Sequence, residues 1–184
     1  LVAQDDGINK NFKEDKFKLV YNKSIHIYQN NSCIERAFFV SDFKVIKSRQ
    51  AILRQLTHSN FKPDKEVIIE EEPSIKIDKA ASRDISSVTI INYSANKVEI
   101  DVDTPNNGFL VLSDMYYPGW KVFVDGKIDK IYRADYILRA VFLTKGRHRV
   151  KFIYDPLSFK AGLYITLFTL ISTLSFIGII KWKD

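Results

Sequence analysis

The chain has 184 residues, with 28 Lys plus Arg against 22 Asp plus Glu, a formal net charge of +6, and 46% apolar residues. This apolar content excludes a wholly disordered chain, and only 7 Gly and 5 Pro exclude a collagen-like or low-complexity protein. A single Cys excludes an internal disulfide, and three scattered His show no metal-ligand spacing, so we expect no metal and no cofactor.

The first part of the chain predicts a small α+β region over residues 17–84, preceded by a polar linker over residues 1–16. Residues 48–58 predict its helix, with Ser48 as the N-cap. Four segments have the alternating or β-rich composition of strands: residues 17–22, 25–29, 36–47 and 65–70. The first two form a hairpin around a short polar turn, and the third is long enough to bend near Ser41.

From residue 85 to residue 158 the pattern becomes all-β. Seven strand-forming segments follow one another: 87–93, 97–103, 109–114, 121–125, 128–133, 138–143 and 147–154. The Asp125–Gly126 pair between two of them predicts a type I′ hairpin, because both central residues of that turn need a positive φ. The spacing of about ten residues predicts an antiparallel β-sandwich or jelly-roll-like domain.

Residues 161–180 contain no charged residue and no Pro. A helix of this length rises about 30 Å, the thickness of the hydrocarbon core of a bilayer. Lys160 and Lys181 flank the run, and Trp182 in the tail of residues 181–184 is an aromatic residue of the interfacial kind. A buried core helix is the alternative, but a core helix this long usually has a polar stripe. The sequence therefore predicts a mainly β domain with one short helix, followed by a C-terminal transmembrane helix.

The first group of candidate binding residues surrounds the turn at Pro118–Gly119 and comprises Asp114, Tyr116, Tyr117 and Trp120. Aromatic rings with a polar edge stack on the apolar faces of sugars, and a neighbouring carboxylate accepts hydrogen bonds from hydroxyl groups. The alternative is that Trp120 belongs to the core and the tyrosines close one end of the sandwich.

The second group of candidates comprises Tyr132, Arg133 and Arg139. Because arginine pairs well with planar anions, Arg133 or Arg139 would bind a phosphate or carboxylate on a lipid-linked donor. The alternative is a cross-strand ion pair with Asp135 or Asp129.

A basic strand precedes the apolar run and carries Lys145, Arg147, His148, Arg149 and Lys151. It would attract anionic lipid headgroups, or alternatively form an ordinary solvated strand face. Elsewhere basic residues alternate with acidic ones and no nucleic-acid-binding motif occurs, so we expect no nucleic-acid partner. No nucleophile–base constellation or phosphate-binding loop occurs either, so no catalytic residue is assigned.

An ordered series of short motifs carries a resemblance to a known family. The series is Leu112–Asp114, Tyr116–Trp120, Val124–Gly126, Tyr132–Tyr136, Arg139–Val141, Gly146–His148 and the helix entry Tyr154–Phe159. It resembles the C-terminal end of the bacterial YfhO-type membrane proteins, which are multi-spanning proteins of the GT-C glycosyltransferase kind, and the likeness extends back to about Phe17. The chain begins at Leu1 without a signal sequence, so we expect it to be part of such a longer protein.

The resemblance implies a parent that transfers a sugar from a polyprenyl-phosphate donor to a cell-envelope polymer such as a teichoic acid. Its catalytic carboxylate would lie in an early loop, and this chain would be an extracytoplasmic accessory domain in the cell membrane. The implied partners are the lipid bilayer, the upstream transmembrane helices, and a cell-wall glycan or polyprenyl-phosphate sugar. Two alternatives remain: a non-catalytic structural or partner-binding module, and a tail-anchored cytoplasmic adaptor, which a simple count of flanking positive charges favours.

Overall fold

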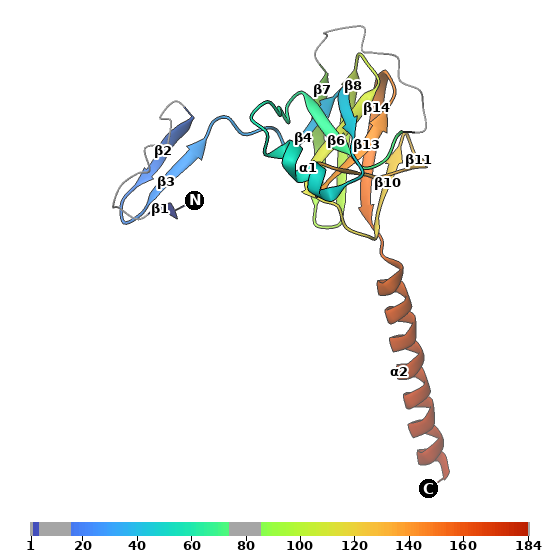
Figure 1. Ribbon diagram of the computed structural model, residues 1–184. Coiled ribbons are helices and arrows are strands. Elements are labelled where there is room, and N and C mark those ends of the chain that lie inside the picture. The colour runs from blue at the N-terminus through green and yellow to red at the C-terminus, as the bar shows by residue number, and fades with distance from the viewer. Residues whose placement is uncertain (1, 4–15, 74–85, 184) are drawn as a thin grey trace. The chain divides into compact units, whose positions relative to one another are not determined.

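The structure is a computed structural model that describes residues 2–3, 16–73 and 86–183 (Figure 1). These residues form two compact units, which divide between Glu35 and Arg36. The predicted linker over residues 1–16 lies largely outside the described residues, as does the predicted boundary between residues 84 and 85.

The first unit is a three-stranded antiparallel sheet in the order β1-β3-β2. Its strands are β1 (Val2–Ala3), β2 (Phe17–Asn22) and β3 (His26–Asn30). The β2–β3 pair confirms the predicted hairpin. None of the side chains described between residues 16 and 35 is buried, so this part of the small sheet has no core of its own.

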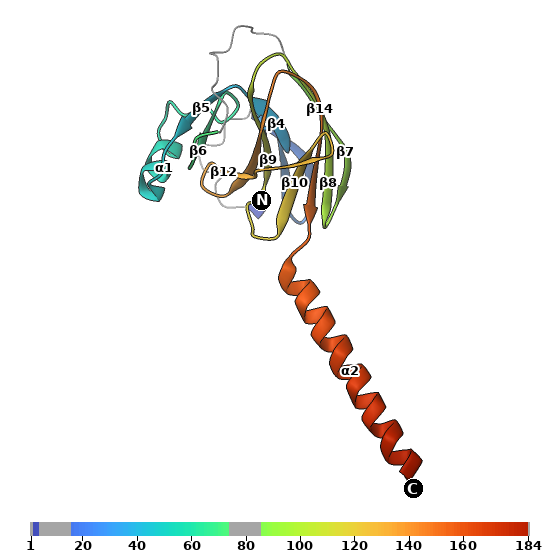
Figure 2. The same ribbon diagram turned by 90° about the vertical axis from the view of Figure 1, so that its right-hand side faces the viewer.

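The second unit contains two larger sheets, which are seen side by side in Figure 2. The five-stranded sheet consists of β11 (Lys127–Asp129), β10 (Trp120–Val124), β14 (Gly146–Tyr154), β8 (Lys97–Thr104) and β7 (Ser87–Ser94), in that order. The six-stranded sheet consists of β4 (Ala37–Val40), β9 (Gly108–Met115), β13 (Leu138–Leu143), β12 (Tyr132–Ala134), β6 (Glu66–Ile69) and β5 (Asp42–Val45), in that order.

Alternate residues of both sheets form the core between them. On β8 these are Val98, Ile100 and Val102, each at most 3% exposed, and Leu110 and Leu112 of β9 join the same cluster. Because successive side chains of a strand point to opposite faces, this alternation is the pattern of two packed sheets. It confirms the mainly β, sandwich-like fold class.

The six-stranded sheet is strongly curled. Its two edge strands, β4 and β5, are joined by Ser41 alone, which allows about 7.6 Å between the flanking Cα atoms. A flat sheet would separate its edges by roughly 24 Å, at about 4.8 Å for each strand pair. The curl encloses a second core, in which the Phe109 ring packs edge-on against Phe43 and Phe142, with centroids 5.2 and 5.3 Å away.

Two predicted strands are interrupted in the structure. Residues 36–47 divide at Ser41 into β4 and β5, the place where the sequence predicts a bend. Residues 128–133 divide into β11 and β12, which belong to different sheets, because the chain crosses from one sheet to the other between them.

One strand pair is parallel rather than antiparallel. β5 and β6 run in the same direction and are connected through α1 (Arg49–Leu56), since parallel neighbours need a crossover connection. Ser48 is the N-cap residue of α1, although its side chain makes no capping hydrogen bond, and Ile52 is buried.

The predicted type I′ turn is present. Val124 pairs with Lys127, and the two residues between them have φ angles of 52° at Asp125 and 81° at Gly126. Both central residues are therefore left-handed, as that turn requires.

The C-terminal helix α2 (Leu157–Lys183) begins after Asp155 and Pro156, which follow β14. Its segment Leu157–Phe176 is long and apolar enough to cross a membrane, and none of that segment is buried. The hydroxyl groups of its three threonines, Thr166, Thr169 and Thr173, donate hydrogen bonds to the carbonyl oxygen four residues earlier. The helix thus satisfies these polar groups internally, as a lipid environment demands.

Candidate functional site

The aromatic turn between β9 and β10 lies against the entry to α2. Gly119 accepts a hydrogen bond from the backbone N–H of Asp155 at 2.8 Å and has a φ of 101°. A Cβ atom at this position would lie 3.0 Å from the Cβ of Pro156, so both the conformation and the close approach favour glycine. The turn is therefore fixed to the end of β14.

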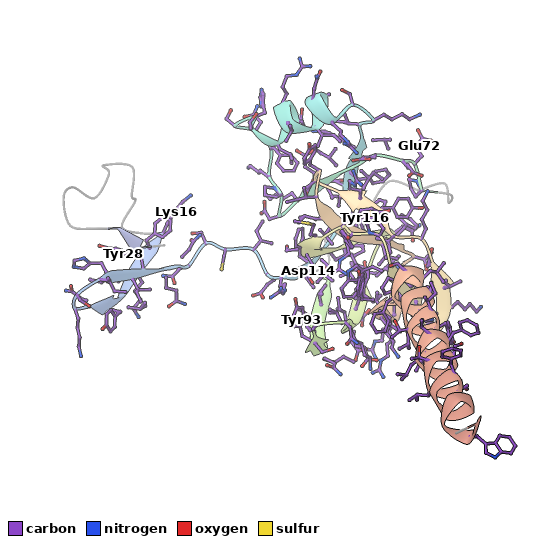
Figure 3. All side chains as sticks on the ribbon, turned by 90° about the horizontal axis from the view of Figure 1, so that it is seen from below. Lys16, Tyr28, Glu72, Tyr93, Asp114 and Tyr116 are labelled. Carbon is purple, nitrogen blue, oxygen red and sulfur yellow. The ribbon has the colours of Figure 1, made fainter. Side chains whose placement is uncertain are left out.

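A pocket of about 360 Å³ opens at this end of the domain. Its aromatic and charged lining residues come from β7, β9, β10, β13, β14 and the aromatic turn, and are Tyr93, Asp114, Tyr117, Trp120, Arg139 and Tyr154. Figure 3 labels Tyr93 and Asp114, which lie side by side. We call this cavity the Arg139 pocket. It brings together four of the seven residues that the sequence predicts as binding residues, Asp114, Tyr117, Trp120 and Arg139.

Arg139 is the buried cation of this pocket, with only 2% of its surface exposed. Its Nη2 donates a hydrogen bond to Oδ2 of Asp114 at 2.9 Å, and its Cζ lies 3.8 Å from the centroid of the Trp120 ring. Burial lowers the pKa of Arg139 from its usual value, while Asp114 opposes that change. The guanidinium keeps its proton, yet Nε and Nη1 are buried without a hydrogen-bond partner.

Asp114 holds two arginines at once. Its Oδ1 accepts hydrogen bonds from Nε and Nη2 of Arg36 at 3.1 and 2.9 Å, and the Tyr93 hydroxyl donates to Oδ2 at 3.3 Å. The hydrogen bond to Asp114 raises the pKa of Arg36. Because its oxygens are already occupied, Asp114 positions the two cations and is not free to accept hydrogen bonds from sugar hydroxyls.

The aromatic rings form the apolar wall. The centroid of the Tyr154 ring lies 5.4 Å from that of Trp120 and 6.4 Å from that of Tyr117. Trp120 is half-buried between Arg139 and Tyr154, whereas Tyr117 is 58% exposed. Tyr117 therefore contributes little to the core and presents its ring to solvent, in the way a stacking residue does.

The other three predicted residues lie apart from the Arg139 pocket. Cζ of Arg133 lies 4.8 Å from the centroid of the Tyr116 ring, and its Nη1 lies 3.6 Å from Oε1 of Glu70. Tyr132 is only 6% exposed and packs edge-on against Phe109, with ring centroids 5.3 Å apart. Tyr132 is thus a core residue, because the curl of the six-stranded sheet turns it inward.

The ion pairs of the two arginines differ from the pairs considered from the sequence. The carboxylate partners are Glu70 for Arg133 and Asp114 for Arg139, rather than Asp129 or Asp135. Asp135 instead accepts a hydrogen bond from the backbone N–H of Ile68.

Sequence reasoning missed Arg36, Tyr93 and Tyr154. Arg36 and Tyr93 lie 78 and 21 residues from Asp114 along the chain, and no local pattern marks them. Tyr154 lies at the end of the last predicted strand, within the motif at the helix entry. Pairing of that strand with the one that begins at Trp120 is the signal that could have placed Tyr154 beside the aromatic turn.

The basic strand β14 is neutralised by its neighbour. Arg147 and Arg149 lie opposite Asp103 and Asp101 of β8 in the strand register, with nitrogen–oxygen distances of 2.8 and 2.9 Å. Lys151 lies opposite Glu99 in the same way, with Nζ and Oε1 3.6 Å apart. These pairs favour a solvated strand face over a patch for anionic lipid.

Across the described residues, no group of three or more His, Cys, Asp and Glu side chains is placed to hold a metal ion.

Comparison with known proteins agrees with the resemblance in the sequence. The family described as "Bacterial membrane protein YfhO" matches residues 5–166. The Bacillus subtilis (strain 168) protein named "Uncharacterized protein YfhO" is 26% identical over 87 residues, which make up 47% of this chain and cover 10% of that protein's length. No solved structure matches the chain significantly. Since the family match extends over most of the sequence, including the β domain and the start of α2, this chain belongs to the YfhO family of bacterial membrane proteins.

Proposed function

We propose that the β domain is an extracytoplasmic accessory domain of a GT-C-like glycosyltransferase. The parent protein transfers a sugar from a polyprenyl-phosphate donor to a cell-envelope polymer. The Arg139 pocket holds the acceptor glycan or the lipid-linked sugar, and α2 anchors the domain in the cell membrane. The domain contributes binding, and the catalytic groups belong to another part of the parent.

The position of the pocket beside α2 is the observation that carries this proposal. Three Cα steps separate Tyr154 from Leu157, so the wall of the pocket lies within about 11 Å of the first residue of the helix. A helix that spans the bilayer keeps the pocket close to the membrane surface. A polyprenyl-linked sugar is presented at that surface, and exposed aromatic rings are suited to stack against it.

Binding is tested by tryptophan fluorescence of the full chain that carries Trp182→Phe, so that Trp120 is the remaining tryptophan. Titration with cell-wall glycan fragments should change the emission of Trp120, and Tyr117→Ala should weaken that response without loss of stability. If the folded domain responds neither to a glycan fragment nor to a polyprenyl-phosphate sugar, the binding role is refuted. If Tyr117→Ala and Trp120→Ala both unfold the domain, a purely structural role is favoured instead.

Orientation is tested through Cys33, the single cysteine of the chain, which is exposed. A membrane-impermeant maleimide should label Cys33 in intact cells that carry the full-length parent, and the Cys33→Ser variant measures labelling at other cysteines. Labelling of Cys33 only after the cells are opened would place the domain in the cytoplasm and refute the proposal.

A further inference from the structure

The unpartnered N–H groups of Arg139 indicate which chemical group the pocket receives. A guanidinium carries five N–H hydrogens, of which three belong to Nε and Nη1. Those two nitrogens are buried and have no hydrogen-bond partner, although Arg139 lines an open pocket. Buried donors are almost always paired in native proteins, so this exception points to a bound acceptor that completes the site.

The charge of the cluster is also incomplete. Arg36 and Arg139 share the single carboxylate of Asp114, which leaves one positive charge uncompensated. Among the described residues that line the pocket, Asp114 and Arg139 are the charged ones, and aromatic rings make up much of the remaining wall. Next to a buried guanidinium and aromatic rings a charge–charge interaction is stronger than in bulk water, so an anion is favoured over a neutral group.

We propose that the Arg139 pocket binds the phosphate group of a phosphate ester, with the organic part of the ester against Tyr117 and Trp120. This inference rests on the proposed function and narrows its ligand. Nε and Nη1 lie on different edges of the guanidinium, so a single phosphate accepts hydrogen bonds from the edge that carries Nη1, and it neutralises the excess charge. The phosphate belongs either to a lipid headgroup at the membrane surface or to a soluble phosphate ester.

The test uses the full chain with Trp182→Phe in amine-oxide micelles, which contain neither phosphate nor sugar. Because Cζ of Arg139 lies 3.8 Å from the Trp120 ring, an anion bound at Arg139 should shift the Trp120 emission. The probes are glycerol phosphate, glycerol, a neutral oligosaccharide, and micelles that contain phosphatidylglycerol or uncharged diacylglycerol.

Three variants connect the response to the site. Arg139→Lys keeps the charge but removes donors, and it should abolish the saturable shift. Arg36→Gln changes a half-exposed side chain, so the domain should fold, and it should weaken phosphate binding because the cluster becomes neutral. Arg149→Lys on the outer face of β14 is the matched control and should leave the shift unchanged.

A shift with glycerol phosphate but not with glycerol, lost in Arg139→Lys and weakened in Arg36→Gln, supports the proposal with a soluble ester as the source. A shift with phosphatidylglycerol alone, lost in the same variants, supports it with a lipid headgroup as the source. A shift with the oligosaccharide but with neither phosphate probe overturns the phosphate inference and leaves the proposed function standing. Phosphate binding that is unchanged in both Arg139→Lys and Arg36→Gln overturns it as well, and no response to any probe refutes both proposals.

Discussion

Asp135 is a buried carboxyl group whose protonation couples the fold to pH. Burial raises the pKa of Asp135 to about 6, although the Ile68 N–H that donates to its Oδ1 at 2.9 Å favours the charged form. In the unfolded chain the same carboxyl titrates near 3.9. The folded state therefore binds the proton more tightly, so the stability from this group is present below about pH 4 and is lost as the pH rises through about 6.

Asp135→Asn should stabilise the domain at pH 7.5 and have little effect at pH 4. The amide keeps an acceptor for Ile68 and tolerates the φ of 44°, but it carries no charge to desolvate. Two pKa units correspond to a gain of up to about 3 kcal/mol in the free energy of unfolding at pH 7.5. Urea unfolding at both pH values measures this difference.

Asp125→Asn is the matched control, because Asp125 also has a positive φ but its pKa is lowered by the backbone N–H of Arg149 and then by His148. The Asp125 carboxylate stabilises the fold above the pKa that it has in the unfolded chain, and this contribution is lost as the pH falls. Asp125→Asn should therefore destabilise the domain at pH 7.5. Equal effects of the two substitutions, or a loss of stability for Asp135→Asn at pH 7.5, would contradict the assignment.

Gly108 allows the six-stranded sheet to close on itself. A Cβ atom at this position would lie 2.4 Å from the carbonyl oxygen of Val40 and 2.9 Å from Cα of Ser41, both of which are backbone atoms. Gly108→Ala should therefore force the corner between β4 and β5 apart and cost about 1–3 kcal/mol in thermal unfolding. Gly162→Ala in α2 has open space around the new methyl group and serves as the control. A melting temperature unchanged by Gly108→Ala would refute this role.

Local sequence patterns predict those structural elements whose conformation depends on neighbouring residues. They do not predict features that depend on packing between segments far apart in the sequence. The Asp125–Gly126 turn needs only its own two residues, and the sequence identifies it correctly. The division of residues 36–47 falls at Ser41, where the sequence predicts a bend, but no local pattern shows that the two resulting strands lie at opposite edges of one curled sheet. The same holds for Tyr132, whose strand-like context does not reveal that it faces Phe109.

The ladder of ion pairs between β8 and β14 should tolerate exchange of its charges. Arg149→Asp places a carboxylate beside Asp101 and should lower the melting temperature, whereas adding Asp101→Arg restores the pair and most of the loss. Because both side chains are exposed, the loss in Arg149→Asp should shrink as salt is raised. If the double variant is no more stable than Arg149→Asp, the pairing does not contribute.

At the scale of the whole molecule, the sequence predicts a β domain and a membrane helix more readily than it predicts the Arg139 pocket. The charge-free run at residues 161–180 is long enough to predict a membrane helix directly. The sequence also identifies two parts of the Arg139 pocket as candidate binding residues, the aromatic turn Tyr117–Trp120 and Arg139, but as separate groups. The cluster becomes a site only when Arg36, which directly precedes β4, and Tyr93 of β7 both contact Asp114, and that depends on the sandwich as a whole.

The β domain should fold without its helix. Its two cores are built from strands, and none of the Leu157–Phe176 segment is buried. A chain that ends at Pro156 should therefore remain soluble without detergent and unfold at nearly the same temperature as the full chain in micelles, as measured by circular dichroism.

The truncation removes Lys160, one of two lysines that pair with Asp155, while Lys121 keeps its contact at 2.7 Å. Lys160→Gln in the full chain measures the loss of that ion pair separately. Aggregation of the truncated chain, or a melting temperature far below that of Lys160→Gln, would mean that α2 contributes to the fold and not to anchoring alone.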